Sequence, residues 1–307
     1  IEGDTIPGHV TWAEEEWTCT VTSSDGTEES EPGHATVIPE WRFSGWGDAP
    51  FPVVDGDAHL VGTTAQAQAG LSTAVAGDVD GDGMLDILVG APQDDSGHTN
   101  AGRAYLALSS HFVGGDTALL SDTHRIIEGT TETERVGSTV AGGIDLGGDS
   151  TPDILVGAYG ADILEPDDGA IGLFWDAGAD SASPLTLADA DVLLHGATDR
   201  ELAGSAMAVM GDMDEDGLPE LLIGAPHNDT GGSRSGTAYL VLGSSMTMSG
   251  TIDLGDHPMF FGESGIDLAG TAVHSAGDID TDGIPELMIS APYNETSGTR
   301  AGRVYIV

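Results

Sequence analysis

Positive charge is nearly absent from this chain. Its 307 residues include 52 Asp and Glu against only eight basic residues, all of them Arg, and the formal net charge at pH 7 is −44. A surface of this sign repels phosphate backbones and anionic lipid, so it excludes nucleic-acid binding and favours cations as partners. An acidic, highly hydrated surface suited to a salty medium is the plainer explanation for acids that lie outside the motifs described below.

Cysteine and long apolar runs are also scarce. Cys19 is the only cysteine, which excludes an intrachain disulfide and a metal site built on cysteines. No uninterrupted apolar run approaches the ~20 residues that a membrane-spanning helix needs, so we expect no membrane span in this chain. The sequence begins at Ile1 without a basic segment followed by an apolar one, and we therefore expect a processed chain or a fragment of a longer one.

A period of about 67 residues organises most of the chain. Acidic clusters begin at Asp78, Asp145, Asp212 and Asp278, which are 67, 67 and 66 residues apart. Each cluster follows a small or apolar residue and a glycine, and it precedes a Gly-Ala-Pro-like triplet and a Gly-led segment with an aromatic residue. Periods of this length indicate a repeat architecture, in which each repeat is one supersecondary unit.

The segments between these signals are typical of strands. They are 4 to 8 residues long, apolar or alternating, and bounded by turn residues, and none has a convincing helical period. Each repeat supplies an outer strand, a strand that enters the acidic loop, a strand that leaves it, and the aromatic strand. We predict an all-β fold, a β-propeller of four-stranded blades, because radial packing leaves only short protected sheet edges. The repeats span about 57–123, 124–190, 191–256 and 257–307.

The first 56 residues differ in kind from the repeats. Residues 17–22 and 34–38 alternate like strands on either side of a turn signal at residues 25–27, which predicts a β-hairpin. This hairpin resembles the last two strands of an immunoglobulin-like module, so residues 1–40 are expected to be part of one, with Cys19 where that fold often keeps a cysteine. Residues 41–56, rich in Trp, Pro and Gly, are expected to form a linker.

Three of the acidic clusters share one template, Asp-x-Asp-x-Asp-Gly-x-x-Asp/Glu, with carboxylates at positions 1, 3, 5 and 9. In a compact loop this spacing turns the side chains toward one centre, the glycine permits the bend, and a carbonyl oxygen at position 7 completes the cage. Oxygen ligands of this number favour Ca²⁺ over Mg²⁺. The candidate ligands, with the position-7 residue acting through its carbonyl, are Asp78, Asp80, Asp82, Met84 and Asp86; Asp212, Asp214, Asp216, Leu218 and Glu220; and Asp278, Asp280, Asp282, Ile284 and Glu286.

The second loop departs from this template, because Gly147 takes position 3. Its candidate ligands are Asp145, Asp149, Thr151 and Asp153, and the loss of one carboxylate predicts a weaker calcium site. A purely structural turn is almost as good an interpretation, since Asp and Gly populate turns for their own backbone reasons. We therefore expect three strong Ca²⁺ sites and one weaker site.

The repeats resemble the FG-GAP repeats of the integrin α-chain propeller. The acidic loop, the Gly-Ala-Pro-like strand and the Gly-led aromatic strand recur together over residues 57–307, although Ala or Val stands where the family has Phe before the Gly. The resemblance implies a ligand-presenting propeller, usually of seven blades, that holds calcium in its blade loops. It implies no ligand-binding residues here, because no motif of this chain corresponds to any.

The sequence does not indicate a catalytic site. It contains ten His, but neither a Ser-His-Asp arrangement nor a paired-His metal spacing. We therefore predict a non-catalytic calcium-binding module for adhesion, or for recognition of a protein or glycan ligand. Extracellular calcium modules bind at about 10⁻⁴ to 10⁻³ M, which predicts a secreted or cell-surface location. Two alternatives stay open: a structural subunit of a surface layer or fibre joined by strand pairing, and an accessory domain of a secreted enzyme.

One prediction concerns how the ring closes. The repeat region opens with an outer-type strand at residues 59–62 and ends on the aromatic strand at residues 303–307, so one strand is spare and one is missing. We expect these two segments to pair antiparallel within one chain, or between neighbouring chains if four blades cannot close a ring.

Overall fold

The structure is a computed structural model that describes residues 17–21, 33–37, 58–95, 97–111, 117–176 and 184–307. The chain divides into two compact units, Ile1–Gly56 and Asp57–Val307. In the first unit, β1 (Trp17–Val21) pairs antiparallel with β2 (Gly33–Val37). These are the two strands of the predicted hairpin. Its turn, the linker at 41–56 and the rest of the expected immunoglobulin-like segment lie outside the described residues.

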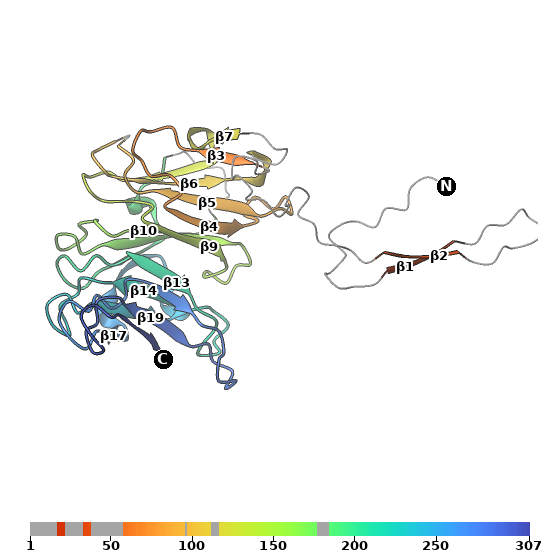
Figure 1. Ribbon diagram of the computed structural model, residues 1–307. Helices are drawn as coiled ribbons and strands as arrows, with labels where there is room; N and C mark the ends of the chain where they lie inside the picture. The colour runs from red at the N-terminus through yellow and green to blue at the C-terminus, as the bar shows by residue number, and fades with distance from the viewer. Residues whose placement is uncertain (1–16, 22–32, 38–57, 96, 112–116, 177–183) are drawn as a thin grey trace, which may run out of the picture. The chain divides into compact units, whose positions relative to one another are not determined.

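The second unit is a succession of antiparallel sheets, here called blades one to four (Figure 1). Blade one is β4 (Ser72–Gly77), β5 (Asp86–Ala91), β6 (Arg103–Ala107) and β8 (Arg125–Glu128). Blade two is β9 (Thr139–Ile144), β10 (Asp153–Ala158), β11 (Ala170–Phe174) and β12 (Val192–His195), and blade three is β13 (Ala206–Val209), β14 (Leu221–Ala225), β15 (Thr237–Val241) and β17 (Met259–Phe261). Blade four has three described strands, β18 (Val273–Ser275), β19 (Leu287–Ala291) and β20 (Arg303–Ile306).

The predicted all-β fold and the four-stranded units are confirmed for the first three blades. The first strands of the blades, β4, β9, β13 and β18, are neighbours in that order, so the blades follow one another as the sequence does. The outer strand of each repeat is the fourth strand of the blade formed by the preceding repeat. Thus β8 pairs with β6, β12 with β11, and β17 with β15. The outer strand of the first repeat, β3 (His59–Val61), therefore precedes blade one.

The hydrophobic core lies between the blades. Leu106 of β6 in blade one clusters with Ile154 and Val156 of β10 in blade two, and all three side chains are fully buried. Leu173 of β11 clusters in the same way with Leu221 of blade three. Alternate residues of a strand point to opposite faces of its sheet, so each blade packs one face on its predecessor and the other on its successor.

Glycine is required where two blades approach most closely. Gly102 makes a parallel bridge to Val136 of the next blade, and the pairs Gly169–Ala203 and Gly236–Ala269 repeat this contact. A Cβ atom on Gly102 would lie 2.4 Å from the Val136 carbonyl oxygen, and φ at Gly102 is +82°. Any other residue there would be strained and would separate the blades.

A parallel strand in the first three repeats was not predicted from the sequence. β7 (Thr117–Leu119) pairs parallel with β3, Leu185 bridges to Ile127 of β8, and β16 (Gly250–Asp253) pairs parallel with β12. A 3₁₀ turn follows each one, and its first residue is a buried leucine. These turns are η4 (Leu120–Asp122), η5 (Leu187–Asp189) and η7 (Leu254–Asp256); η3 (Ser109–His111) and η6 (Gly243–Met246) follow the aromatic strands.

The predicted pairing of the first and last strands within one chain is wrong. β3 pairs with β7, a strand of its own repeat, whereas β20 pairs with β19 in the part of the chain that the structure describes. The pairing with β7 does not itself exclude a pairing with β20, because β12 pairs with β11 along one edge and with β16 along the other. β3 and β20 do not pair because they stand at opposite ends of the succession of blades.

Candidate metal centres

Each acidic loop joins the first two strands of a blade and is folded by its own carboxylates. In the first loop, the Gly83 N–H donates to Asp78 Oδ2 and the Val79 N–H donates to Asp86 Oδ2, both at 2.9 Å. The bond from position 6 to position 1 recurs at 2.9 Å in the third loop and 3.0 Å in the fourth. The φ of Gly83 is +87°, in the left-handed region that glycine adopts without strain.

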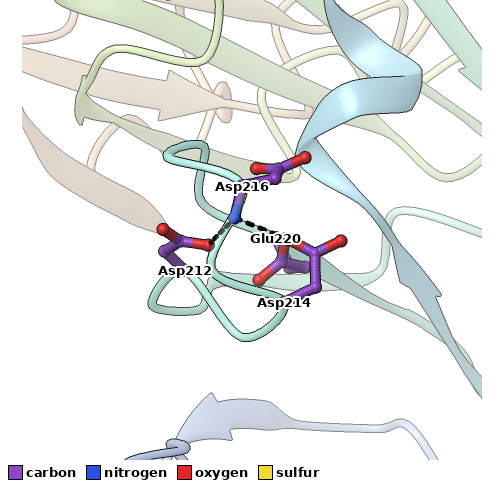
Figure 2. Close-up of side chains that lie close together, drawn as sticks. All are labelled: Asp212, Asp214, Asp216 and Glu220. Carbon is purple, nitrogen blue, oxygen red and sulfur yellow. Dashed lines mark hydrogen bonds between the residues drawn. The ribbon is translucent and has the colours of Figure 1, made fainter.

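The third and fourth loops bring together all four predicted carboxylates. In each loop, one oxygen per side chain lies within 4.8 Å of the others, and the sets are Asp212, Asp214, Asp216 and Glu220, and Asp278, Asp280, Asp282 and Glu286. Figure 2 shows the third loop wrapped around this set, with the Asp216 N–H donating to Asp212 Oδ1 at 3.0 Å and to Asp214 Oδ1 at 3.3 Å. Four carboxylates so close together repel one another, and a multivalent cation between them would relieve that repulsion.

The first loop brings together three of its four carboxylates, those of Asp78, Asp80 and Asp86. Asp82 stands outside that set. Its Oδ1 accepts the Met84 N–H at 2.8 Å, and its Oδ2 accepts the Ser109 hydroxyl at 3.3 Å. The hydrogen bond from the Ser109 hydroxyl to Asp82 Oδ2 is long, so a rotation of this exposed side chain can bring its carboxylate toward the other three.

Buried carboxylate oxygens without a hydrogen-bond partner occur in three of the loops. They are Asp78 Oδ1, Asp153 Oδ1 and Glu220 Oε1. A buried acceptor without a partner costs free energy, and a carboxylate oxygen more than a neutral one. The first and third loops therefore each combine converging carboxylates with an unsatisfied oxygen, which is what a bound cation would require. The residues present fit a metal ion at these two loops.

Burial changes the acid strength of the position-9 carboxyl groups. It raises the pKa of Asp86 and of Glu220, while backbone N–H donors oppose the shift. The pKa of Asp153 is raised to about 6, first by burial and then by the neighbouring Asp149 and Asp145 carboxylates. A cation beside these groups would lower their pKa values again, since it stabilises the ionised form.

The second loop is arranged differently from the other three. Asp145 accepts the N–H groups of Gly148, Asp149 and Ser150 at 2.5, 3.0 and 2.8 Å. At position 3, a Cβ atom on Gly147 would lie 3.6 Å from the indole ring of Trp175. Among the described residues, the carboxylates of this loop do not form a set like those of the other loops.

The position-7 residues are placed by their own N–H groups. Met84, Leu218 and Ile284 donate to the position-5 carboxylates at 2.8, 2.9 and 2.8 Å. In the second loop, the Thr151 N–H donates to Asp149 Oδ1 at 2.8 Å. These bonds fix the chain direction at position 7, and the proposed role of the carbonyl oxygens stays a prediction.

A second group of buried carboxylates was missed at the sequence level. Glu201 is fully buried, and its Oε2 accepts the hydroxyls of Tyr239 and Thr198, both at 2.9 Å, and the Asn228 amide. Glu134 and Asp267 occupy the equivalent positions, and the 67- and 66-residue steps between the three are the signal that could have found them. Glu134 Oε2 accepts the Thr130 and Thr131 N–H groups, and Asp267 Oδ2 accepts the Asn294 amide, so all three carboxylates act as internal caps.

Comparison with known proteins agrees with this repeat structure. The model of the FG-GAP repeat matches residues 69–106, 203–241 and 269–307. Human phosphatidylinositol-glycan-specific phospholipase D is 32% identical over 167 residues, which are 52% of this chain and 19% of that protein. Integrin alpha-PS2 of Drosophila melanogaster is 35% identical over 104 residues, 33% of this chain and 7% of the relative. Integrin alpha-3 of Cricetulus griseus is 27% identical over 208 residues, 67% of this chain and 18% of the relative.

The chain thus spans less than a fifth of the length of each of these relatives. No helix in the described part of the chain is both long and apolar enough to cross a membrane. The matched segments each run from the small-residue–glycine pair to the aromatic strand and include an acidic loop with four carboxylates. The predicted β-propeller fold is confirmed, and three segments of the repeat region match the FG-GAP repeat.

Proposed function

We propose that this protein is an extracellular, calcium-stabilised β-propeller module that recognises a protein or glycan ligand and catalyses no reaction. One observation supports this proposal most directly: the first and third loops each combine converging carboxylates with a buried oxygen that has no hydrogen-bond partner. Ca²⁺ is the proposed ion because the ligand set consists of oxygens alone, at the number and spacing that this ion prefers.

The ligands proposed for each ion are the carboxylates at positions 1, 3, 5 and 9 and the carbonyl oxygen at position 7. The strong sites are the first, third and fourth loops, and the second loop is a weaker site at best. A bound Ca²⁺ would connect the two strands that meet at the loop, because position 1 follows one strand and position 9 begins, or directly precedes, the next. The ion would thereby stiffen each blade at its loop end.

The experiment compares the thermal unfolding of the chain in millimolar calcium with that in excess chelator. A ligand that binds only the folded state adds RT ln(1 + [L]/Kd), about 0.4 kcal/mol per site when calcium equals Kd and about 1.4 kcal/mol at ten times Kd, so three sites together should give a clearly higher Tm in calcium. Isothermal titration should give three ions per chain with dissociation constants of about 10⁻⁴ to 10⁻³ M. Equal Tm values in the two conditions would refute the calcium proposal.

A second candidate function rests on the relative that is named as an enzyme. Because the similarity to phosphatidylinositol-glycan-specific phospholipase D extends over 52% of this chain, the propeller could be an accessory domain of a secreted enzyme. Glycan and matrix-protein arrays would support recognition if the purified chain binds one class of ligand in a calcium-dependent way. An accessory domain would leave catalysis to another part of the polypeptide, so both alternatives predict no phospholipase turnover by this chain. The sequence of the uncut polypeptide distinguishes them, since the second candidate requires a catalytic domain in it.

A further inference from the structure

The second repeat departs from the others at two residues, and these two residues face each other. Gly147 takes position 3 of the acidic loop, where the other loops have a carboxylate, and Trp175 is the single tryptophan of residues 57–307. A Cβ atom on Gly147 would lie 3.6 Å from both Cδ1 and Nε1 of Trp175. In blade two, an indole ring thus borders the position that a carboxylate occupies in the other loops.

Two polar atoms beside this position are buried and have no hydrogen-bond partner among the described residues. They are Trp175 Nε1, which only donates, and Asp153 Oδ1, which accepts. Asp153 is completely buried, and its other oxygen, Oδ2, accepts the Leu146 and Gly147 N–H groups at 2.7 and 3.0 Å. Oδ2 lies 3.8 Å from the Cβ position of Gly147, so the donor and the carboxylate border the same small space.

In the first loop the chain itself satisfies the equivalent oxygen. Asp86 Oδ1 accepts the Ser109 N–H at 2.7 Å. The strand register places Asp176 at the position of Ser109 in the second repeat, but Asp176 has a φ of +49°, and its Oδ1 accepts the Thr151 hydroxyl at 3.3 Å. No described N–H group donates to Asp153 Oδ1, which therefore requires a donor from outside the described chain.

A metal ion does not satisfy this pair of atoms. The indole N–H of Trp175 presents the positive end of its dipole to position 3, where it repels a cation. The other carboxylates of the loop already face donors, because Asp145 accepts three backbone N–H groups and Asp149 Oδ1 accepts both the N–H and the hydroxyl of Thr151, at 2.8 and 2.5 Å. Within the described residues they also do not converge as those of the other loops do. The residues of the second loop do not fit a calcium ion.

We propose that the second loop holds a buried water molecule in place of a metal ion, and that Gly147 and Trp175 together exclude the ion. The water accepts the indole N–H and donates to Asp153 Oδ1, so it satisfies both buried atoms. Buried waters of this kind make about 2 to 4 hydrogen bonds and are part of the folded structure. Blade two then keeps its loop conformation without calcium. The proposal concerns contacts within blade two alone, and it does not depend on calcium in the other loops.

A crystal structure of the chain in about 10 mM calcium, ten times the weakest dissociation constant expected, identifies the occupant. We expect a peak about 2.9 Å from Trp175 Nε1 and about 2.8 Å from Asp153 Oδ1, which are the distances of hydrogen bonds to water. A calcium ion would lie about 2.3 to 2.6 Å from carboxylate oxygens. An ion beside Asp153, or no peak between the two atoms, would overturn the proposal.

Gly147→Asp tests how the ion is excluded. The φ of Gly147 lies outside the left-handed region and the contacts of a Cβ atom are ordinary, so the site accepts a side chain without strain. The added carboxylate should accept the indole N–H, displace the water and complete the template of four carboxylates. In equilibrium dialysis this variant should therefore bind one more calcium ion than the wild type.

Ser150→Asp is the matched control, because it adds the same charge to the same loop at an exposed residue away from the indole, and it should bind no further ion. If Gly147→Asp binds no more calcium than a wild type that does bind it, the proposed role of Gly147 and Trp175 is wrong. A wild type that binds no calcium at all would refute the calcium proposal for the other loops instead, and the peak beside Asp153 in the crystal would then decide this one.

Discussion

At the scale of single residues, the loops should differ in how they depend on one carboxylate. Asp80 belongs to the set that the first loop brings together, whereas Asp149 is held by Thr151 outside such a set. We expect Asp80→Asn to weaken one calcium site about tenfold or more, because each lost charge lowers the affinity of an oxygen cage. The measurement is isothermal titration of each variant.

Asp149→Asn is the matched control for that substitution. It removes the same charge from a loop that already lacks a carboxylate at position 3, so we expect the three stronger sites to keep their affinities. Asparagine retains an oxygen that can accept the local backbone N–H, and both variants should therefore keep the loop conformation. Equal losses of bound calcium in the two variants would contradict the ranking of the loops.

A substitution at Gly83 tests the backbone strain of the first loop without a change in side-chain packing. Its φ is +87°, and an added Cβ atom would meet nothing within 4 Å. Gly83→Ala should therefore destabilise the protein by about 1 to 2 kcal/mol through left-handed strain alone. Gly97→Ala is the control, since its Cβ atom would make an ordinary contact at 3.5 Å and its φ is not in that region. Urea unfolding in chelator compares the two, and similar losses would contradict this account.

At the scale of secondary structure elements, each of the 3₁₀ turns that follow the parallel segments begins with one buried leucine. Leu120 is completely buried and packs with Val89 and Tyr105, whereas Leu119 beside it is 43% exposed. Leu120→Ala should cost about 2 to 5 kcal/mol of unfolding free energy, the usual range for a buried leucine, and Leu119→Ala much less. Chemical denaturation of both variants measures this, and a loss below 1 kcal/mol at Leu120 would show that the turn does not hold its segment on blade one.

Strands were predictable where the sequence of a single repeat contains a local signal for them. The acidic loop, the Gly-Ala-Pro-like strand and the aromatic strand each carry a local signal, and all three were placed correctly. The parallel strands and their turns were missed because strands as short as β7 carry little alternation. A signal did exist in the Leu-x-Asp triplets at Leu120, Leu187 and Leu254, which are 67 residues apart, as are the loops.

The candidate site was predictable to a similar degree. Spacing alone identified the converging carboxylates of the third and fourth loops, because alternate residues of a tight loop point to one side. It could not show that Asp82 turns toward Ser109, nor that the indole of Trp175 approaches position 3 of the second loop. Both contacts come from residues 27 or 28 positions away in the sequence, beyond the reach of a local motif.

At the scale of the whole molecule, the sequence pattern indicated one spare outer strand and one missing outer strand, but not whether the two pair within one chain. The spare strand and the missing strand follow from where the repeats begin and end their pattern. Whether one chain bends far enough to join them depends on the angle between successive blades, and that angle arises from the packing of many side chains. The sequence pattern carries no local signal for it, so the intrachain pairing was predicted wrongly.

The acidity of the whole molecule leads to a prediction about pH. The pKa of Asp153 is raised from 3.8 to about 6, so between about pH 4 and pH 6 the folded chain holds a proton that the unfolded chain releases. The stability of the metal-free protein should therefore fall as pH rises through this window. Relief of the net charge of −44 at lower pH acts in the same direction.

Thermal unfolding in chelator at pH 5 and pH 7 measures the combined effect, and we expect the higher Tm at pH 5. Asp153→Asn separates the two causes, because asparagine keeps an oxygen for the Leu146 and Gly147 N–H groups but cannot ionise. The variant should lose part of the difference between the two pH values and retain the part that comes from net charge. In calcium the trend should weaken or reverse, since protons compete with the ion for the same carboxylates. A higher Tm at pH 7 than at pH 5 in chelator would show that neither the buried carboxyl groups nor the net charge destabilises the metal-free fold.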